Sequence, residues 1–335
     1  MKLSYCIVLL VSFALTAVTL RFLIPYLKSR KLGQKILEIG PRWHKSKEGT
    51  PTMGGLSFLL AFLLTVPAAL LFDSRWGTYA EDLSVVLVTV LFALLNGAIG
   101  ILDDRTKFSK GKNEGLLSWQ KYLLQLTVTV LYLVAMSYFD GISTDVPLPP
   151  LFDRTISIHP VLYYPLAALL ITGMINSVNL ADGIDGLAAT ETAVVALFFS
   201  AVSFIMGSFS LGMVAAATLG GCIGFLVYNF YPARVFMGDT GSLFLGALVV
   251  GMAFLIQNPL VIVVVGLMYL VETVSVILQV GYFKLTHGKR LFKMSPIHHH
   301  FEKCGWSEIK IVTVFSSLTL LLSILVFLAL SRIYR

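Results

Sequence analysis

The stretch that decides the fold is LSYCIVLLVSFALTAVTLRFLIPY, residues 3–26, in which Arg21 is the one charged side chain. The apolar core of a secretion signal has about 7–15 residues, whereas about 20 are needed to cross a bilayer. Lys2 in front of the stretch gives it a signal-like start, but its length predicts a retained first transmembrane span.

The composition of the chain excludes most other protein classes. Of its 335 residues, 57% are hydrophobic and 13% are charged, against about 25% charged in a soluble globular protein. The chain is therefore neither a cytosolic enzyme, nor disordered, nor a secreted disulfide scaffold, and its three distant cysteines form no disulfide or zinc pattern. We expect one all-α polytopic membrane domain over residues 1–335, embedded in a lipid bilayer.

Apolar segments of span length recur to the end of the chain. Each is expected to be a helix, because the backbone of a membrane span must satisfy its own hydrogen bonds. The weakest break, at Gly207 and Ser208, separates the sixth segment from the seventh. The ten predicted spans are 3–25, 52–72, 83–102, 117–138, 161–178, 187–206, 211–229, 243–257, 260–283 and 310–331.

The distribution of basic residues orients these spans. Five loops, at 26–51, 103–116, 179–186, 230–242 and 284–309, carry 17 Lys and Arg, whereas the remaining loops and the two ends carry 5. By the positive-inside rule the first set is cytoplasmic and both termini lie outside. The net charge of +7 is thus mainly a signal of topology and indicates no nucleic-acid partner. It suits an anion that approaches from the cytoplasm.

The motif DDRTK follows the third span and begins with Asp103 and Asp104. Carboxylates are electrostatically disfavoured at the C-terminal end of a helix, so capping does not explain them. Two adjacent acids at a membrane surface suit a divalent cation or a general base. The alternative is a solvated start of the loop, with Arg105 and Lys107 as local partners.

A second acidic run, NSVNLADGIDG at 176–186, ends the fifth span. Gly183 and Gly186 allow the helix to break, so that the acids fold back under the asparagines. Asn and Asp oxygens are hard ligands that suit Mg²⁺. The alternative is that Asp185 caps the sixth span. The polar side chains of the run are Asn176, Asn179, Asp182 and Asp185.

Two further motifs lie on the same predicted side. FMGDTGS at 236–242 is a glycine-rich turn before the eighth span, and such a turn at a helix N-terminus is typical of a phosphate-binding site. Asp239 within the turn indicates a metal that bridges it to the phosphate. The alternative is that Asp239 is only a helix N-cap. In PIHHHFE at 296–302, three consecutive histidines on a helix would point three ways. They cannot all bind one metal, so one or two would contact phosphate or carboxylate, and the alternative is plain surface.

One more motif and one single residue are also notable. KEGTPTMGG at 47–55 opens the second span; Lys47 offers a point charge for phosphate, and Gly54 and Gly55 permit close helix contact. Glu272 lies within the ninth span, where a charge is costly. It is therefore either functional or neutral and hydrogen-bonded.

Together these motifs resemble the polyprenyl-phosphate N-acetylhexosamine 1-phosphate transferase superfamily. They occur in the order typical of that superfamily and cover the whole chain. Two of them, TPTMGG and PIHHHFE, resemble the branch that transfers phospho-N-acetylmuramoyl-pentapeptide. The matching strings are TPTMGG at 50–55, DDRTK at 103–107, NSVNLADGIDGLA at 176–188, FMGDTGS at 236–242 and PIHHHFE at 296–302.

The resemblance implies ten spans, a homodimer, a requirement for Mg²⁺, and a cytoplasmic active site in a bacterial inner membrane. The implied reaction is the first membrane step of peptidoglycan synthesis. It moves phospho-MurNAc-pentapeptide from UDP-MurNAc-pentapeptide to undecaprenyl phosphate and gives lipid I and UMP. One diphosphate link replaces another, so the main obstacle is the meeting of two anions, which a metal and lysines relieve.

The resemblance also implies roles for single residues. Asn179 and Asp239 would bind Mg²⁺, beside Asp104, and Asp103 would be the base for the lipid phosphate. Lys107 and His298 would contact the diphosphate or its leaving group. The remaining substrate-binding residues would be Lys47, Thr52, Asn176, Asn179, Asp182, Asp185, Phe236, Gln279 and His299, with Phe236 stacking on uracil and Asp185 accepting from its N–H. A single displacement and a two-step route through a phospho-aspartate both stay open.

Two other functions compete with this interpretation. A membrane transporter would explain ten spans and Glu272, but transporter sites lie near the middle of the bilayer and often between two repeated halves, and this chain shows no repeat. A sister transferase would move GlcNAc-1-phosphate to the same lipid; the HHHFE string argues against it.

Overall fold

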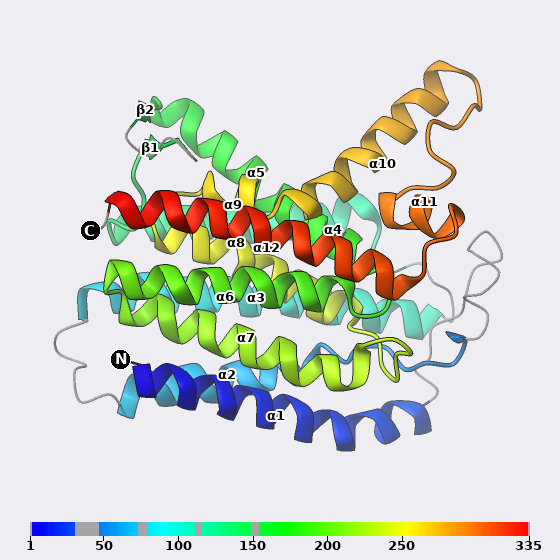
Figure 1. Cartoon of the computed structure of the whole chain (residues 1–335), viewed down its shortest axis with the longest axis horizontal. Helices are drawn as coiled ribbons and strands as arrows, with labels where there is room; N and C mark the ends of the chain where they lie inside the picture. The colour runs from blue at the N-terminus through cyan, green and yellow to red at the C-terminus, as the bar shows by residue number, and fades with distance from the viewer. Residues whose placement is uncertain (1, 31–46, 73–79, 111–114, 149–153, 334–335) are drawn as a thin grey trace.

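The computed structural model describes residues 2–30, 47–72, 80–110, 115–148 and 154–333, which form a bundle of long helices (Figure 1). Much of the predicted basic loop at 26–51 and part of the outer loop at 139–160 lie outside the described residues. The elements are α1 (Lys2–Ser29), α2 (Leu56–Phe72), α3 (Ala80–Lys110), α4 (Ser118–Tyr138), β1 (Asp145–Pro147), β2 (Thr155–Ser157), α5 (Pro160–Ala181), α6 (Leu187–Met206), α7 (Phe209–Asn229), α8 (Gly238–Leu255), α9 (Val261–Val265), α10 (Leu267–Leu285), α11 (Ile297–Lys303) and α12 (Glu308–Ile333).

Nine of the ten predicted spans each overlap one helix, and the ninth, 260–283, is divided between two. Within the described ranges, nine helices are long and apolar enough to cross a membrane. The additional one, α2, has 17 residues and is roughly 26 Å long, a little shorter than a hydrocarbon core of about 30 Å. The weak break between α6 and α7 is also present, because Gly207 leaves the helix with φ +67° and Ser208 Oγ accepts from Leu211 N.

Three local features differ from the prediction. Helix α3 continues through the DDRTK motif to Lys110, because Thr106 Oγ1 bonds the carbonyl of Leu102 and Lys107 pairs with Asp103 one turn earlier. The proline-rich loop, which the charge pattern predicts to lie outside, contains an antiparallel pair, β1 and β2. The ninth span is not continuous: Gly266 separates α9 from α10, and α10 leaves the bundle at an angle (Figure 1).

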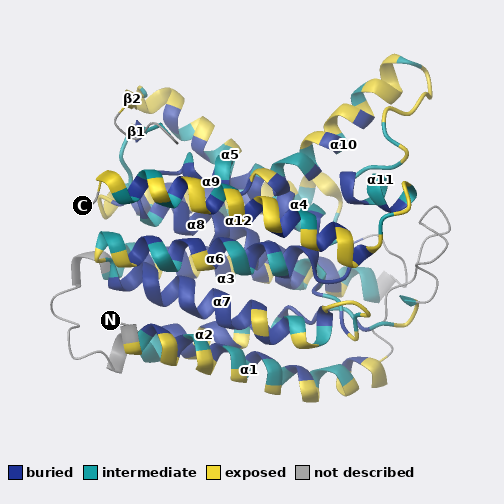
Figure 2. Ribbon diagram, in the orientation of Figure 1, coloured by how far each residue is buried: buried dark blue, intermediate teal, exposed yellow. Residues whose placement is uncertain are grey.

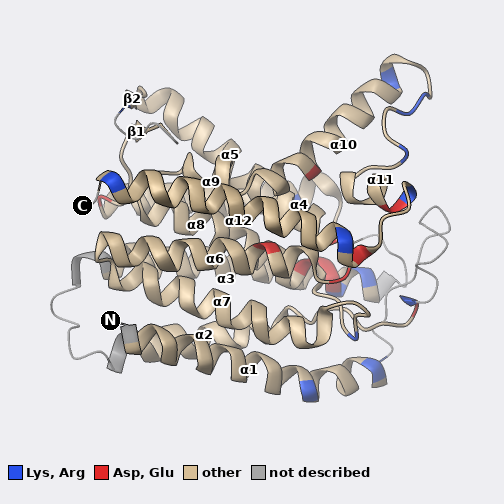
Figure 3. Cartoon of the chain, viewed as in Figure 1, with Lys and Arg blue, Asp and Glu red and all other residues tan. Residues whose placement is uncertain are grey.

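Burial and charge distinguish the interior of the bundle from its two ends. Among the described long helices, α7 and α8 are the most buried, and they form the centre of the core (Figure 2). The two termini lie at one end of the bundle, whereas most of the described Asp and Glu residues lie toward the other end (Figures 1 and 3). The chain thus concentrates its acids on one face, which we call the motif end.

Candidate active site at the motif end

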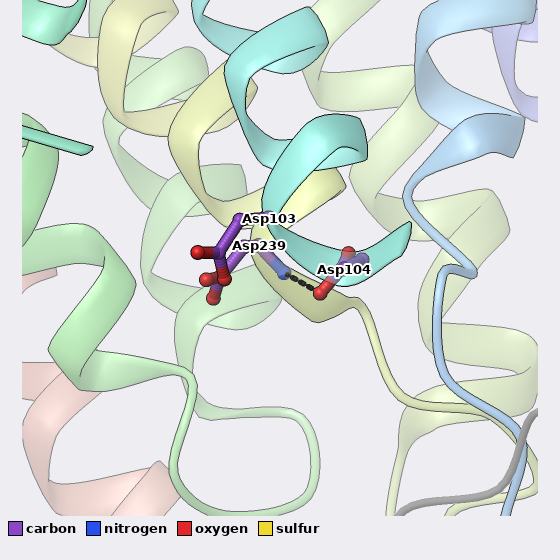
Figure 4. A group of neighbouring side chains, drawn as sticks. All are labelled: Asp103, Asp104 and Asp239. Atoms are coloured by element: carbon purple, nitrogen blue, oxygen red, sulfur yellow. Dashed lines mark hydrogen bonds between the residues drawn. The ribbon is translucent and has the colours of Figure 1, made fainter. Parts of the chain in front are cut away.

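Three carboxylates converge at the motif end. Asp103 and Asp104 lie on α3, Asp239 lies in the first turn of α8, and one oxygen from each lies within 4.8 Å of the others (Figure 4). The helices approach closely because Gly100 of α3 faces the backbone of Asp239, where a Cβ would collide with the Asp239 carbonyl. The structure therefore brings together the predicted base Asp103, the predicted metal ligand Asp239 and their predicted neighbour Asp104. We call them the acid cluster.

Asp104 is held by the N-terminus of α8. Its Oδ2 accepts from Thr240 N at 2.9 Å and Thr240 Oγ1 at 2.8 Å, and its Oδ1 accepts from Asp239 N at 3.2 Å. A helix N-terminus attracts anions because its first N–H groups lack partners. The glycine-rich turn that the sequence suggested as a phosphate seat is thus already filled by a carboxylate of the protein. Asp239 is also not the N-cap, which is Met237.

Two lysines neutralise part of the acid cluster. Lys107 Nζ lies 2.8 Å from Asp103 Oδ2, 3.6 Å from Asp104 Oδ1 and 2.9 Å from Asp239 Oδ2. Lys121, on α4, reaches Asp239 Oδ2 at 2.8 Å. Three carboxylates and two ammonium groups leave a net charge of −1 when all are ionised. The cluster therefore remains attractive to a cation.

The donor chemistry of the acid cluster fits Mg²⁺. Carboxylate oxygens are the hard ligands that this ion prefers, and oxygens of three different residues already converge. The side chain of Lys107, which contacts all three carboxylates, is 31% exposed, so solvent reaches the cluster beside it. The cluster can hold a divalent metal, and the identity of the ion is a proposal.

The asparagines of the fifth span contact different partners. Asn179 donates to Asp239 Oδ1 at 2.9 Å and to Ser242 Oγ at 2.7 Å, which ties α5 to the first turn of α8. Its Oδ1 accepts from Lys121 at 3.2 Å. Asn176 lies one turn earlier and donates to Gln125 Oε1 on α4 at 2.8 Å. Asn179 thus borders the acid cluster, whereas Asn176 supports the helix that carries it.

The chain turns sharply after α5, as the glycine pattern predicted, and the turn holds Asp182 between α5 and α6. Burial raises the pKa of Asp182 well above its usual range, and the negative charges of Asp239, Asp104 and Asp185 raise it further. Asp182 therefore keeps its proton more readily than an ordinary aspartate. It faces the acid cluster as part of the same electrostatic site.

Asp185 belongs to a second cluster, formed with Lys47 and Glu308, which we call the Lys47 triad. Lys47 Nζ lies 2.7 Å from Asp185 Oδ1 and 2.6 Å from Glu308 Oε1. The backbone closes the triad, because Asp185 Oδ2 accepts from Ala233 N at 2.8 Å and Glu308 Oε2 accepts from Asp185 N at 2.9 Å. Lys47 is thus no free charge for phosphate here, and Asp185 does not cap α6, whose N-cap is Gly186.

The TPTMGG segment lies against the turn before α8. Phe236 N donates to the carbonyl of Pro51 at 2.8 Å, and Gly54 N donates to the carbonyl of Phe236 at 2.9 Å. Gly238 has φ +73°, and a Cβ there would lie 2.6 Å from Asp104 Oδ2 and 2.9 Å from Thr52 Oγ1. Thr52 and Phe236, both predicted pocket residues, therefore lie beside the acid cluster.

The three histidines of α11 point to three different partners, as expected for consecutive residues on a helix. His298 is fully buried and its Nδ1 lies 3.1 Å from Glu272 Oε2 on α10. His299 Nδ1 lies 2.6 Å from Glu302 Oε2 within α11, and His300 Nδ1 accepts from the backbone N–H of Lys293 at 3.1 Å. Glu302, at 4% exposure, is therefore a buried partner and not an exposed loop charge.

Gln279 is the predicted pocket residue on α10. Its Oε1 accepts from the backbone N–H of Phe292 at 2.8 Å, and the side chain is buried. In this arrangement Gln279 anchors the segment between α10 and α11. By this contact it holds the segment that leads to the histidines of α11.

Sequence reasoning missed two charged residues of the site. Lys121 was assigned to the apolar fourth span, yet it contacts both Asp239 and Asn179. The feature of the sequence that could have revealed Lys121 is its position, because it is a lone lysine near the start of that apolar span. Glu308 was left outside the motifs, and no pattern in the sequence indicates that it meets Lys47, because 261 positions separate the two residues.

Comparison with known proteins places the chain in a family. The sequence pattern of Glycosyl transferase family 4 matches residues 86–257, and phospho-N-acetylmuramoyl-pentapeptide-transferase signature 1 matches residues 47–59. Proteins named phospho-N-acetylmuramoyl-pentapeptide-transferase are 44% identical over 96% of this chain in Clostridium botulinum (strain Alaska E43 / Type E3) and 45% identical over 90% of it in Heliobacterium modesticaldum. These matches cover 95% and 89% of the relatives' own lengths.

The chain belongs to the phospho-N-acetylmuramoyl-pentapeptide-transferase family. The resemblance that the five motifs suggested is thereby confirmed, and the chain is a phosphoglycosyl transferase in type. The signature at 47–59 contains Lys47 and Thr52, and the match at 86–257 contains the acid cluster. Family membership does not by itself assign a role to each residue of the site.

Proposed function

We propose that this protein transfers phospho-MurNAc-pentapeptide from UDP-MurNAc-pentapeptide to undecaprenyl phosphate, forming lipid I and UMP. The observation that carries the proposal is family membership over nearly the full chain. The convergence of predicted motif residues at one end of a membrane bundle supports it independently. A site at the surface of the membrane can meet a soluble nucleotide and a lipid phosphate at once.

The motif end faces the cytoplasm in this proposal. The loops that connect the helices there carry most of the Lys and Arg of the chain, and the positive-inside rule assigns such loops to the cytoplasm. Both termini lie at the opposite end and hence outside. The protein would be a multi-pass enzyme of the bacterial inner membrane, and it would form a homodimer of single-domain subunits spanning residues 1–335.

Magnesium is the cofactor that the acid cluster would hold. Asp239 and Asp103 are the first candidate ligands, and Asn179 lies beside Asp239 with its amide. Bound there, the ion would neutralise and align the phosphate oxygens of the two substrates. Asp104 would hold the first turn of α8, and with it Asp239, in the required place.

The residues around the acid cluster would bring the two anions together. Lys107 and Lys121 would bind phosphate oxygens with the ammonium groups that now contact Asp239. Asp103 would accept the remaining proton of the lipid phosphate, whose second ionisation lies near pH 6, so that little basicity is needed. His298 would contact the diphosphate as the UMP group leaves.

The nucleoside and sugar would occupy the space between the TPTMGG segment and α11. Phe236 would stack on uracil, and Thr52, Asn179 and Asp182 would donate or accept hydrogen bonds beside it. Gln279 and His299 would form the wall on the side of α10 and α11. Lys47 and Asp185 would shape this pocket through the Lys47 triad, and Asn176 would support it through Gln125.

The test is a substrate exchange with the purified full-length protein. Incubation with undecaprenyl phosphate, Mg²⁺ and UDP-MurNAc-pentapeptide is expected to release UMP and form lipid I. UDP-GlcNAc in place of the muramoyl substrate is the matched control. Turnover of UDP-GlcNAc alone would favour the sister transferase. Uptake of a solute without release of UMP would favour a transporter.

A further inference from the structure

Glu272 is a buried carboxylate that the proposed reaction does not yet use. It lies on α10, within a membrane-spanning helix, and has no solvent exposure. Its Oε2 lies 3.1 Å from His298 Nδ1 and 3.4 Å from the backbone N of His298. A carboxylate at this depth is costly unless a partner compensates it, so the pairing with His298 accounts for its presence.

The other nitrogen of His298 lies against the turn between α5 and α6. His298 is fully buried, and neither of its ring nitrogens has a hydrogen-bond partner in the described part of the chain, so Nδ1 meets Glu272 through a close ion-pair contact of 3.1 Å. Nε2 packs against Gly183, where a Cβ would overlap the ring. Gly183 directly follows Asp182, which interacts electrostatically with Asp239 and Asp104. The ring therefore connects Glu272 on one side to the turn that borders the acid cluster on the other.

We propose that Glu272 is a positioning residue that acts through His298. Its carboxylate lies 3.1 Å from Nδ1 and accepts from the backbone N–H of His298, so it limits the movement of the ring and keeps Nε2 on the side of Gly183. A carboxylate beside one ring nitrogen also favours the tautomer with the hydrogen on that nitrogen, which gives this pairing a defined chemical effect. The inference rests on the proposed function, in which His298 contacts the diphosphate as UMP leaves.

Glu191 provides a matched comparison within the same bundle. It lies on α6, it is fully buried, and neither of its carboxylate oxygens has a hydrogen-bond partner among the described residues. Burial of a carboxyl group without a hydrogen-bond partner is costly in an apolar interior. Glu191→Gln therefore changes a buried carboxyl group that contacts no histidine, whereas Glu272→Gln changes the carboxyl group that faces His298.

The experiment is a double-mutant cycle with Glu272→Gln, His298→Ala, the double variant and Glu191→Gln, each purified as the full chain. Glu272→Gln is expected to lower kcat roughly 10- to 100-fold, the range seen when a partner that orients a histidine is removed. The KM for UDP-MurNAc-pentapeptide should change less than about threefold. Glu191→Gln should stay within about twofold of the wild type. In the His298→Ala background, Glu272→Gln should add no further loss.

A purely structural role would give a different pattern. Losses that multiply in the double variant, or wild-type kcat in Glu272→Gln, would overturn the proposal while leaving the transferase function intact. A fully active His298→Ala would remove its basis. No transfer by the wild type would instead contradict the proposed function itself. If Glu272→Gln does not fold, Glu272→Asp replaces it in the same cycle; a lower kcat with unchanged KM, absent without His298, is then expected.

Discussion

The acid cluster and the Lys47 triad lie at the same end of the bundle and are built from the same residue types, yet they differ in what neutralises their carboxylates. In the triad, Lys47 is 15% exposed and backbone N–H groups hold the remaining oxygens of Asp185 and Glu308. In the acid cluster, backbone N–H groups also hold Asp104, but Asp239 is held by side chains: two lysines share its Oδ2, and the more exposed of them contacts all three acids.

The comparison indicates which cluster can exchange its lysine contacts for a metal ion or a phosphate. A backbone N–H cannot move away without unfolding its turn, so the Lys47 triad is a fixed structural contact. A lysine ammonium on a flexible stem can release a carboxylate to a metal or bind a phosphate instead. Substitutions in the acid cluster should therefore affect the chemical step, and substitutions in the triad should affect stability and binding.

The largest expected effect is that of Asp239→Asn. It removes the charge that both Lys107 and Lys121 contact and that a metal would need, while it keeps the size of the side chain. We expect kcat to fall about 100- to 1000-fold, as when one electrostatic contact to a transition state is lost, with little change in melting temperature. Glu302→Gln, a buried change paired with His299, is the matched control and should cost far less. Equal, small losses in both variants would contradict the assignment of Asp239.

The next effect concerns Lys121, which contacts Asp239 and Asn179 from α4. Lys121→Met keeps the length of the side chain and removes the charge. We expect a loss of roughly 10- to 100-fold in kcat, measured as release of UMP. Lys310→Met, at an exposed lysine beside Trp306, should leave the rate unchanged. A Lys121→Met variant with the wild-type rate would exclude Lys121 from the chemical step.

A smaller effect on rate is expected for Lys47→Met. The substitution leaves Asp185 and Glu308 close together without their shared cation, and removal of one partner of a buried ion pair is destabilising by about 3 kcal/mol. The melting temperature in detergent should fall and the KM for UDP-MurNAc-pentapeptide should rise, whereas kcat changes less than in Lys121→Met. A kcat loss as large as that of Asp239→Asn, without any loss of stability, would erase the difference between the two clusters.

No change in rate is expected from the variants that test orientation. Cys304 is exposed at the motif end, and Thr155 is exposed on β2 at the end with the termini. With Cys6→Ser and Cys222→Ala, the remaining Cys304 should be protected from an impermeant thiol reagent in intact cells. Thr155→Cys in a cysteine-free chain should react. The opposite pattern would place both clusters outside, where a cytoplasmic nucleotide cannot reach them.

Much of the architecture could be predicted from the sequence because a bilayer imposes a length and composition on each span. The ten segments, the break at Gly207 and the turn after the fifth span all follow from local patterns. The break at Gly266 could not be predicted, because one glycine in an apolar run is equally compatible with a straight helix. The extension of α3 past Leu102 depends on the pairing of Lys107 with acids of its own helix and of α8.

The sequence predicts which acidic residues form the site, but it does not predict most of the residues that they contact. Asp103, Asp104 and Asp239 stand in unusual motifs, and the structure brings them together. Two interpretations stay predictions, because the structure adds long-range contacts that the sequence does not reveal. The phosphate seat at α8 is filled by Asp104, and Lys47 is engaged by Asp185 and Glu308. Such pairings arise only when helices far apart in the sequence meet.

The most direct test of the account is the metal dependence of transfer. Protein stripped with EDTA and supplied with UDP-MurNAc-pentapeptide and undecaprenyl phosphate should release no UMP. Addition of Mg²⁺ in excess of the chelator should restore full turnover, because two anionic substrates must meet beside three converging carboxyl groups that would otherwise repel them. Full turnover in the chelator would contradict the assignment of the acid cluster as a metal site.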